Sequence, residues 1–307
     1  MIYTCTMNTA IDIFIAVNDL IPKVVNRTLG QDIQANGKAV NISFVLKMLG
    51  ISSVATGFSA GFTGRFIEEE LAKKGIKPDF VHTEGITRLN VFTNVISQNT
   101  EYKLVNPGPF VSEENMKELL AKISAICSDD ILCVSGSNPK GVPEDINVQI
   151  AQIAQKNGFK FVLDSSSSDV LDSLFCKPYI LKPNIDELAD WFGKKSLTDE
   201  EVVEYAKKLI EKGAQNVIVS LGSQGAIFVN KETAIYANAP KGKVVNTACA
   251  GDTMLATFLA GLVENKPIKD ILRKAVAAGS STAFKPGLTD FSDIDALTEQ
   301  VKVVDIK

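Results

Sequence analysis

The sequence predicts an α/β fold in which helices cover both faces of a mostly parallel β-sheet. Short apolar runs typical of buried strands alternate along the chain with longer runs whose apolar residues recur at helical spacing. Parallel strands need crossover connections of about this length, and parallel sheets are normally covered on both faces. The 307 residues contain no internal repeat and no low-complexity linker, so we expect a single domain over residues 1–307.

The strand and helix patterns follow one another in a βαβα rhythm. Buried strands are expected at 2–7, 53–58, 131–134, 160–164, 179–181 and 216–220; helices are expected from the turn 36–41, at about 65–74, at 112–126 and 143–157, from Pro183, and at 198–213, 252–264 and 268–283. Residues 226–238 predict a hairpin. Two segments, approximately 13–35 and 87–106, alternate apolar and polar residues, and we expect them to form a small β-sheet lid beside the main sheet.

Composition and charge restrict the classes of partner. Lys and Arg number 32 and Asp and Glu 36, so the net charge is −4 and no basic field indicates nucleic acid or anionic lipid. No apolar stretch approaches the roughly 20 residues of a membrane span, and Met1 leads into a strand pattern without a basic leader. We therefore expect a cytoplasmic protein that binds small molecules and has no nucleic-acid or membrane partner.

Cysteine and histidine usage excludes several kinds of site. The five cysteines, at positions 5, 127, 133, 176 and 249, form neither a Cys-x-x-Cys pair nor an even framework, so reduced and mostly buried thiols are expected. His82 is the single histidine of the chain. One histidine excludes a His-rich metal site and argues against a Ser-His-Asp triad.

A turn of small residues precedes the helix expected at 252–264. In the stretch Val245-Asn246-Thr247-Ala248-Cys249-Ala250-Gly251-Asp252-Thr253, few side chains shield the backbone N–H groups, and the helix dipole adds positive potential. The sequence therefore predicts an anion site here. Asp252 has two interpretations: it is an N-cap of its own helix, a role that Asp favours anywhere, or it is a catalytic carboxylate that faces a substrate hydroxyl beside the anion.

Polar residues follow the first strand and open the first helix. Asp12 ends the run Asn8-Thr9-Ala10-Ile11-Asp12 and is expected at the carboxyl end of the first strand, the edge at which ligands bind in open α/β sheets; the alternative is that it caps a turn. Gly37 permits a close approach of the backbone to a ligand. Lys38 and Asn41 are three residues apart and share one helix face.

The expected lid and a later turn carry candidate ligands for phosphate and metal. The lid carries Arg27, Arg88 and Lys103. Three cations on one small element favour phosphate over the alternative of separate solvated charges. Asn184 and Glu187 lie one helical turn apart, which suits a Mg²⁺ that keeps several waters; the same spacing is typical of a capped first turn.

Taken in order, these motifs resemble the PfkB-type carbohydrate kinases of the ribokinase-like fold, and within them the branch of 1-phosphofructokinase and tagatose-6-phosphate kinase. The resemblance covers essentially the whole chain. It rests on the order of Asn8 to Asp12, Gly37-Lys38 to Asn41, Gly61-Phe62-Thr63-Gly64, Thr87-Arg88, Ser135-Gly136-Ser137, Lys182-Pro183-Asn184 to Glu187, Ser220-Leu221-Gly222 and Ala250-Gly251-Asp252.

The resemblance implies a catalytic role for the anion site. Asp252 would accept the proton of the attacking sugar hydroxyl, and the amides of Ala250, Gly251 and Asp252, in the turn that begins at Cys249, would hold the transferring phosphoryl group. Phosphoryl transfer passes through a loose transition state, so a carboxylate of ordinary basicity suffices as the base. The resemblance therefore favours catalysis over capping for Asp252.

The resemblance also implies the ligands, with ATP as phosphate donor and Mg²⁺ as metal. Sugar-phosphate binding would fall to Asp12, Gly37, Lys38, Asn41, Arg27, Arg88, Lys103 and Ser137, nucleotide binding to Lys182, Asn184, Ser220, Gly222 and Gly225, and metal binding to Asn184 and Glu187. The lid would close over the sugar, exclude water and form the contact of a homodimer.

The sequence departs from the family pattern at several positions. Asn36-Gly37-Lys38-Ala39 stands where the family has Gly-Gly-Lys-Gly, and Cys249 stands where it has glycine. Thr9 replaces a usual proline and Asn138 a usual leucine. We therefore hypothesise an active kinase with an altered sugar preference.

Three functions follow from these observations. The first is a 1-phosphofructokinase, which phosphorylates the 6-hydroxyl of fructose 1-phosphate, and the run from Gly61 to Ile67 favours it. The second is a tagatose-6-phosphate kinase, which phosphorylates the 1-hydroxyl of a ketohexose 6-phosphate. The third is a sugar-phosphate sensor without turnover. Retention of Asp252 and Glu187 argues against this sensor, whereas the lost glycines argue for it.

Overall fold

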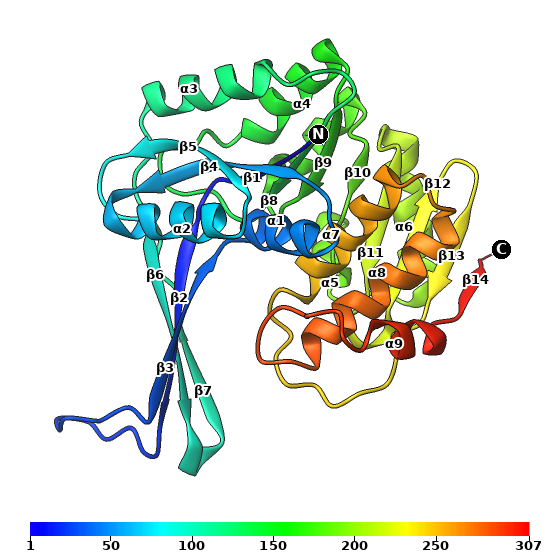
Figure 1. Ribbon diagram of the computed structural model, residues 1–307. Helices are drawn as coiled ribbons and strands as arrows, with labels where there is room; N and C mark the ends of the chain where they lie inside the picture. The colour runs from blue at the N-terminus through cyan, green and yellow to red at the C-terminus, as the bar shows by residue number, and fades with distance from the viewer. Residues whose placement is uncertain (307) are drawn as a thin grey trace.

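The computed structural model describes residues 1–306 and confirms the α/β fold (Figure 1). Within these residues, ten strands form one sheet. Seven neighbouring strands are parallel, and an antiparallel hairpin with one further antiparallel strand extends the sheet at one side. In spatial order they are β14 (Val303–Asp305), β13 (Ala234–Ala237), β12 (Ala226–Asn230), β11 (Asn216–Ser220), β10 (Ile180–Leu181), β9 (Lys160–Asp164), β8 (Ile131–Ser135), β1 (Ile2–Thr6), β4 (Ser53–Ala60) and β5 (Lys77–Thr83).

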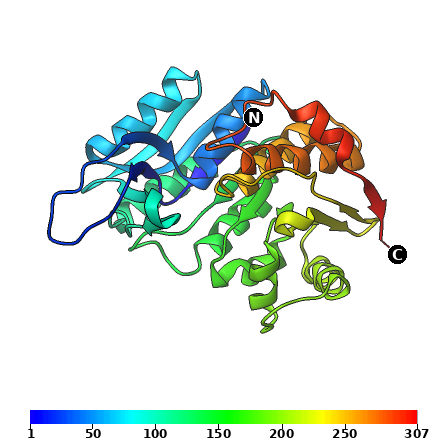
Figure 2. The same ribbon diagram turned by 90° about the horizontal axis from the view of Figure 1, so that it is seen from below.

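Helices cover both faces of the main sheet, as the buried apolar runs of its strands require (Figure 2). One face carries α1 (Lys38–Met48), α2 (Gly61–Lys73), α7 (Ala250–Val263), α8 (Ile268–Ala283) and α9 (Ile294–Gln300); the other carries α3 (Glu113–Ser124), α4 (Ile146–Asn157), α5 (Ile185–Trp191) and α6 (Asp199–Lys212). No helix within residues 1–306 is long and apolar enough to cross a membrane.

A second, four-stranded sheet forms the lid and projects from the main sheet (Figure 1). Its order is β3 (Gly30–Asn36), β2 (Ala10–Val17), β6 (Arg88–Val95) and β7 (Thr100–Leu104), with β2 and β6 parallel and the outer pairs antiparallel. Ile11 belongs to a buried apolar cluster with Val40 and Phe44 of α1. The base of the lid therefore packs on the helix that follows it.

The structure corrects three details of the sequence interpretation. Asp12 does not follow the first strand of the main sheet, because β1 ends at Thr6 and Asp12 lies inside lid strand β2. Helix α2 begins at Gly61, where the backbone has φ 59°, rather than near residue 65. The C-terminal helix α9 and strand β14 were not expected, since both are short and weakly patterned.

Candidate active site

The first turn of α7 forms the anion site. Cys249 immediately precedes the helix in a left-handed conformation, with φ 63°, and its side chain makes no capping hydrogen bond. Within residues 1–306, the N–H groups of Gly251 and Asp252 have no hydrogen-bond acceptor, whereas the N–H of Ala250 faces the carbonyl of Thr247 at 3.4 Å. Two backbone donors are therefore free at the positive end of the helix dipole.

Asp252 lies inside α7 and is not its N-cap, so the capping interpretation is wrong. Its carboxylate is buried and accepts a hydrogen bond from Asn41 Nδ2 of α1 at 2.9 Å. Burial, and next the negative charge of Asp164, raise the pKa of Asp252 to about 6, against the opposing effects of Asn41 and nearby lysines. Above that pH the side chain is an ionised, water-shielded carboxylate that can accept a proton.

Two lysines place positive charge beside this helix terminus. Asp164, at the carboxyl end of β9, accepts ion pairs from Lys182 Nζ at 3.1 Å and from Lys38 Nζ at 3.4 Å. Burial would raise the pKa of Asp164, but the two ammonium groups outweigh it and hold that pKa below its ordinary value. A Cβ atom added to Gly251 would lie 3.5 Å from Lys182 Nζ, so this ammonium group borders the free amides of α7.

Lys38 remains charged although it is partly covered. Burial lowers its pKa, but the carboxylates of Asp164, Asp252 and Glu187 outweigh burial and raise the pKa above its ordinary value. Its side chain is 42% exposed, against 5% for Lys182. The buried Lys182 is thus fixed in place, whereas the more exposed Lys38 is accessible to a bound anion.

A chain of amide side chains joins the lid to the anion site. Asn90 Nδ2 donates to Asp12 Oδ1 at 2.8 Å, and Asn36 Nδ2 donates to Asp12 Oδ2 at 2.5 Å. Asn41 Nδ2 in turn donates to Asn36 Oδ1 at 2.8 Å and to Asp252. Burial raises the pKa of Asp12, although its amide partners and Arg88 oppose that shift.

A cavity of about 300 Å³ lies between the lid and the start of α7. Its lining includes Asp12, Asn36 and Asn41 together with Lys103 of the lid and Cys249. The structure therefore brings three of the expected sugar-binding residues, Asp12, Asn41 and Lys103, to one cavity that reaches Cys249 at the start of α7.

Not every expected lid cation reaches this cavity. Arg88 does not line the cavity: its guanidinium donates to the carbonyls of Asn8 at 3.1 Å and Asn106 at 3.3 Å, and its charge acts on Asp12. Arg27 lies in the exposed loop between β2 and β3 and does not line the cavity. Of the three lid cations, only Lys103 is part of the cavity wall.

The candidate nucleotide and metal residues lie at the carboxyl ends of β10 and β11. Asn184 Oδ1 accepts from the N–H of Glu187 at 2.7 Å, and Glu187 Oε2 accepts from the N–H of Asn184 at 2.9 Å, so the two form a capping box for α5. Ser220 ends β11 and forms a single parallel bridge with Asn184. Within residues 1–306, no three His, Cys, Asp or Glu side chains group as a metal site.

The other expected ligand positions differ in exposure. Ser137 and Gly222 are exposed, at the turns that follow β8 and β11. Gly225 is buried with φ 109°, and a Cβ atom there would lie 2.0 Å from the carbonyl oxygen of Ala237. Glycine is thus required at 225 by the backbone packing alone.

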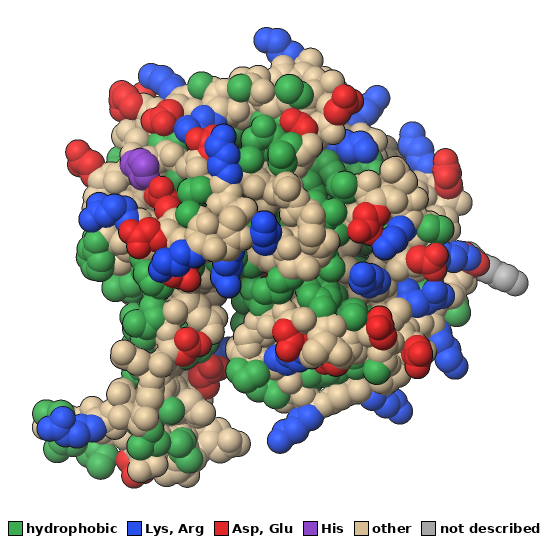
Figure 3. Space-filling view, viewed as in Figure 1, with side chains coloured by type: hydrophobic (Ala, Val, Ile, Leu, Met, Phe, Trp, Pro, Cys, Tyr) green, Lys and Arg blue, Asp and Glu red, His purple; other side chains and the backbone are tan. Residues whose placement is uncertain are grey.

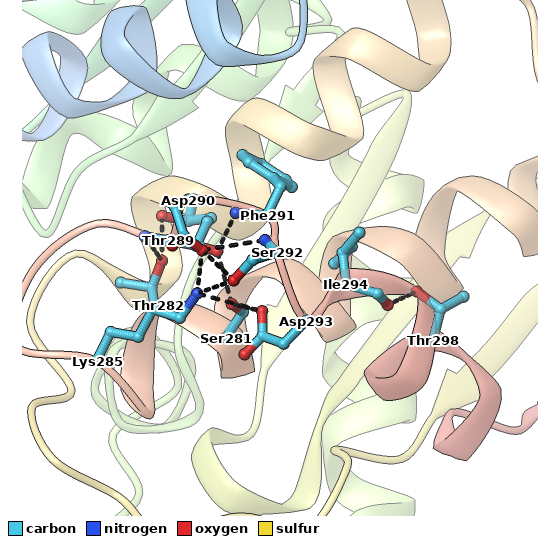
Figure 4. A network of polar contacts seen from close by, with 11 residues as sticks. Ser281, Thr282, Lys285, Thr289, Asp290, Phe291, Ser292, Asp293, Ile294 and Thr298 are labelled. Carbon is cyan, nitrogen blue, oxygen red and sulfur yellow. Dashed lines mark hydrogen bonds and ion pairs between the residues drawn. The ribbon is translucent and has the colours of Figure 1, made fainter.

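A cluster of polar side chains joins α8 to the loop that follows it (Figure 4) and reaches α7 through Thr282. Thr282 of α8 donates to Thr253 Oγ1 at 2.9 Å and accepts from the N–H of Thr289 at 3.1 Å. Ser281 shares a hydrogen bond with Thr289 at 2.6 Å and donates to Asp293 at 2.5 Å. The cluster therefore ties α8 and the loop that follows it to the start of α7.

The structure adds three residues to those expected from the sequence. Asp164, Asn36 and Asn90 each hold an expected site residue in place. The position of Asp164 at the end of a buried strand was a signal that could have identified it. Asn90 lies in the middle of lid strand β6, so no local pattern distinguishes it from a solvated strand residue.

Comparison with known proteins identifies the family. The model of the pfkB family of carbohydrate kinases matches residues 5–295. The D-tagatose-1-phosphate kinase of Bacillus licheniformis is 48% identical over 304 residues, which is 99% of each chain. The 1-phosphofructokinase of Bacillus subtilis is 36% identical over 303 residues, again 99% of each chain.

A solved structure agrees with these relatives. Phosphofructokinase-2 from Escherichia coli in complex with substrates and products has a TM-score of 0.89 and 28% identity, and the match covers 97% of this chain and 98% of that one. Fold, site and relatives thus lead to the same conclusion. The chain belongs to the pfkB family of carbohydrate kinases and is a sugar-phosphate kinase.

Proposed function

We propose that this kinase transfers the γ-phosphoryl group of ATP to the 6-hydroxyl of a ketohexose 1-phosphate. D-Tagatose 1-phosphate is the first candidate, since the 48% identical relative is named for it, and D-fructose 1-phosphate is the second, since the 36% identical relative is a 1-phosphofructokinase. Both names place the existing phosphate at carbon 1, which favours this order over phosphorylation of tagatose 6-phosphate. ATP is the phosphate donor of this family.

The observation that carries the proposal is the carboxylate of Asp252 beside two free amides. The pKa of about 6 keeps this side chain ionised at neutral pH, so it can accept the proton of the sugar hydroxyl. Proton transfer and attack must occur where the phosphoryl group is held, and Gly251 lies next to Asp252 in the same helical turn. The geometry therefore supports in-line transfer to a hydroxyl rather than binding alone.

The positive groups supply the remaining stabilisation. The amides of Gly251 and Asp252 and the ammonium of Lys182 border the position where charge develops on the transferring group. These donors are fixed before the substrate binds, because Lys182 is held by Asp164. Lys38, which is more exposed, is positioned to follow the anion as it moves from donor to acceptor.

The residues of this site offer few ligands for a divalent cation. Glu187 Oε2 is engaged in the capping box, and within residues 1–306 its Oε1 has no hydrogen-bond partner. One available carboxylate oxygen suits Mg²⁺, which keeps several waters and is held mainly by the phosphates of the nucleotide. When bound, Mg²⁺ would neutralise phosphate charge, with Glu187 as the protein group nearest to it.

The sugar phosphate is proposed to span the cavity from Asp252 to the lid. Its reacting hydroxyl would lie near Asp252 and its phosphate near Lys103, which pairs with Glu101 at 3.0 Å and would exchange that carboxylate for the phosphate. Asp12 and Asn41 lie between these two ends and can bind the intervening hydroxyls. In this arrangement, Asp12 and Asn41 separate the phosphate already present from the hydroxyl to be phosphorylated.

We further propose a homodimer in which two lids pack together. Hydrophobic side chains gather on the projecting lid (Figure 3), and those exposed on β3 and the loop before it are Leu20, Ile21, Val24, Val25, Leu29 and Ile33. Arg27 lies on the same loop and would then face the partner chain. Sedimentation of the wild type and of Val25→Glu tests this: a monomeric wild type would contradict the proposal.

The substrate proposal is tested with four sugar phosphates and ATP. ADP release is measured with D-tagatose 1-phosphate, D-fructose 1-phosphate, D-tagatose 6-phosphate and D-fructose 6-phosphate, and binding of each is measured by calorimetry. We expect one 1-phosphate to exceed both 6-phosphates by at least about tenfold in kcat/KM. Preference for a 6-phosphate would overturn the order of phosphorylation, and tight binding without turnover would favour the sensor.

A further inference from the structure

Asn36 occupies a central position in the candidate active site, and the inference drawn from it rests on the proposed ketohexose 1-phosphate substrate. Hydrogen bonds form a path from Asp252 through Asn41 and Asn36 to Asp12, and the charge of Arg88 acts on Asp12. If the reacting 6-hydroxyl lies at one end and the phosphate on carbon 1 at the other, the middle of this path faces the hydroxyls on carbons 3 and 4.

One hydrogen of the Asn36 side-chain amide, on Nδ2, has no oxygen acceptor within residues 1–306. Its Oδ1 accepts from the N–H of Gly37 at 2.6 Å and from Asn41 Nδ2 at 2.8 Å, so both lone pairs are used. Its Nδ2 carries two hydrogens: one is donated to Asp12 Oδ2 at 2.5 Å, and the other has no oxygen acceptor within residues 1–306 and meets only the sulfur of Cys249, a weak acceptor that a sugar hydroxyl can displace. Because Oδ1 accepts two hydrogen bonds, rotating the amide by half a turn would lose both of them. The orientation of the amide is therefore fixed, and the second hydrogen of Nδ2 keeps its position.

Asp12 supplies the complementary acceptor beside this donor. Each of its oxygens receives one amide hydrogen, from Asn36 and from Asn90, and each keeps a further lone pair. Both Asp12 and Asn36 line the cavity. A free N–H donor and a carboxylate acceptor held at hydrogen-bond distance from each other match two adjacent hydroxyls, one accepting and one donating.

We propose that Asn36 is a specificity-determining residue whose free Nδ2 hydrogen binds the hydroxyl on carbon 4 of the ketohexose 1-phosphate while Asp12 binds its neighbour on carbon 3. D-Tagatose and D-fructose differ only in the configuration at carbon 4. The wrong epimer turns that hydroxyl away and leaves the N–H of Asn36, a half-buried residue, without this partner when the sugar covers it. A donor that the bound substrate covers but does not pair is the kind of penalty that separates closely similar substrates.

Asn36 also has a purely structural interpretation, in which it merely links the lid to α1. A structural role would change kcat/KM for both epimers by the same factor, since the link does not touch carbon 4. A specificity role changes the ratio between the epimers. The ratio of the two kcat/KM values, with KM for ATP as reference, is therefore the decisive quantity.

The experiment compares two variants of Asn36 with a matched control. Asn36→Gly removes the amide, and Asn36→Asp keeps its size but replaces the donor by an acceptor. Asn265→Gly makes the same chemical change at an exposed position with φ 54°, where glycine is unstrained. We expect both Asn36 variants to lower the epimer ratio by about tenfold or more, mainly through KM, and the control to keep the ratio of the wild type.

A 4-deoxy ketohexose 1-phosphate tests the same contact without relying on variants. The wild type should use it about tenfold less well than the preferred epimer, whereas Asn36→Gly should use the two equally. A folded Asn36 variant that keeps the wild-type ratio, or a wild type indifferent to the deoxy analogue, would overturn the inference. If the wild type uses neither 1-phosphate, the proposed substrate has failed instead, and the two failures are distinguishable.

Discussion

Replacing Asp252 with asparagine should abolish catalysis and at the same time stabilise the folded protein. The carboxylate is buried, and its pKa rises from 3.8 to about 6 on folding. Because the folded-state pKa is raised, ionisation costs stability: the cost is complete above pH 6 and disappears as the pH falls toward 4. A shift of about two units corresponds to about 3 kcal/mol, which asparagine, neutral and nearly isosteric, would recover at pH 8.

Thermal unfolding and steady-state kinetics measure the two effects. For a chain of this size, about 3 kcal/mol corresponds to a rise in Tm of about 5 °C at pH 8, and this rise should shrink as the pH is lowered to 4.5. Loss of the base should lower kcat by about 10²- to 10⁴-fold. In the wild type, kcat/KM should fall below pH 6 and reach about a tenth of its plateau near pH 5.

Asp164→Asn is the matched control, because it makes the same change at a buried carboxylate whose pKa is shifted in the opposite direction. The pKa of Asp164 is held below its ordinary value by Lys182 and Lys38, so its ionised form stabilises the fold above its unfolded pKa and loses that effect in acid. Its variant leaves Lys182 buried without a counter-charge and should be less stable by about 3 to 5 kcal/mol. If both variants lower Tm at pH 8, or if activity persists to pH 4, the charge assignment at Asp252 is refuted.

Variants at four further positions test other parts of the molecule. Lys182→Met should lower kcat by about 100-fold in steady-state assays, since it removes a fixed donor beside the anion hole; a decrease below tenfold would contradict that role. Gly225→Ala should cost several kcal/mol in denaturant unfolding, because its Cβ meets a carbonyl, whereas Gly222→Ala, with open space, should cost only about 1 to 2. Thr282→Val should lower stability by about 2 kcal/mol, and Thr282→Ser should restore it if the hydrogen bond to Thr253 is responsible.

The sequence was sufficient to predict the architecture, because each buried strand is a short apolar run and each covering helix has helical periodicity. The lid was harder to delimit. Its first strand begins at Ala10, directly after β1, so Asp12 could not be assigned to the lid by pattern alone. Helix α9, with seven residues, is held by packing of Leu297 rather than by a strong local signal. Short elements of this kind depend on tertiary contacts that no local pattern contains.

A site residue could be predicted from the sequence where its role depends on a local pattern, and could not where its role depends on contacts between distant parts of the chain. The helix terminus at Asp252 was identifiable, because a small-residue turn before an apolar helix is a local feature. The choice between cap and base was not, since it depends on Cys249 adopting a left-handed backbone and on Asn41 reaching Asp252 from another helix. Asp164 contacts Lys38, 126 residues away in the chain, and the amide of Asn36 contacts Asp12, 24 residues away. Such contacts become visible only when the strands and helices are assembled.

The start of α7 combines two features that each cost stability. Cys249 adopts φ 63°, which costs a residue with a side chain about 1 to 2 kcal/mol, and Asp252 carries a buried charge. The rest of the helix offsets them: residues 252–261 are all buried, and Thr253 is tied to Thr282 of α8. A strained turn with unpaired amides and a buried carboxylate can persist only where packing and hydrogen bonds of this kind stabilise the helix that follows it. The apolar packing of α7 and α8 is therefore the structural condition for the phosphoryl-transfer site that we propose at the start of α7.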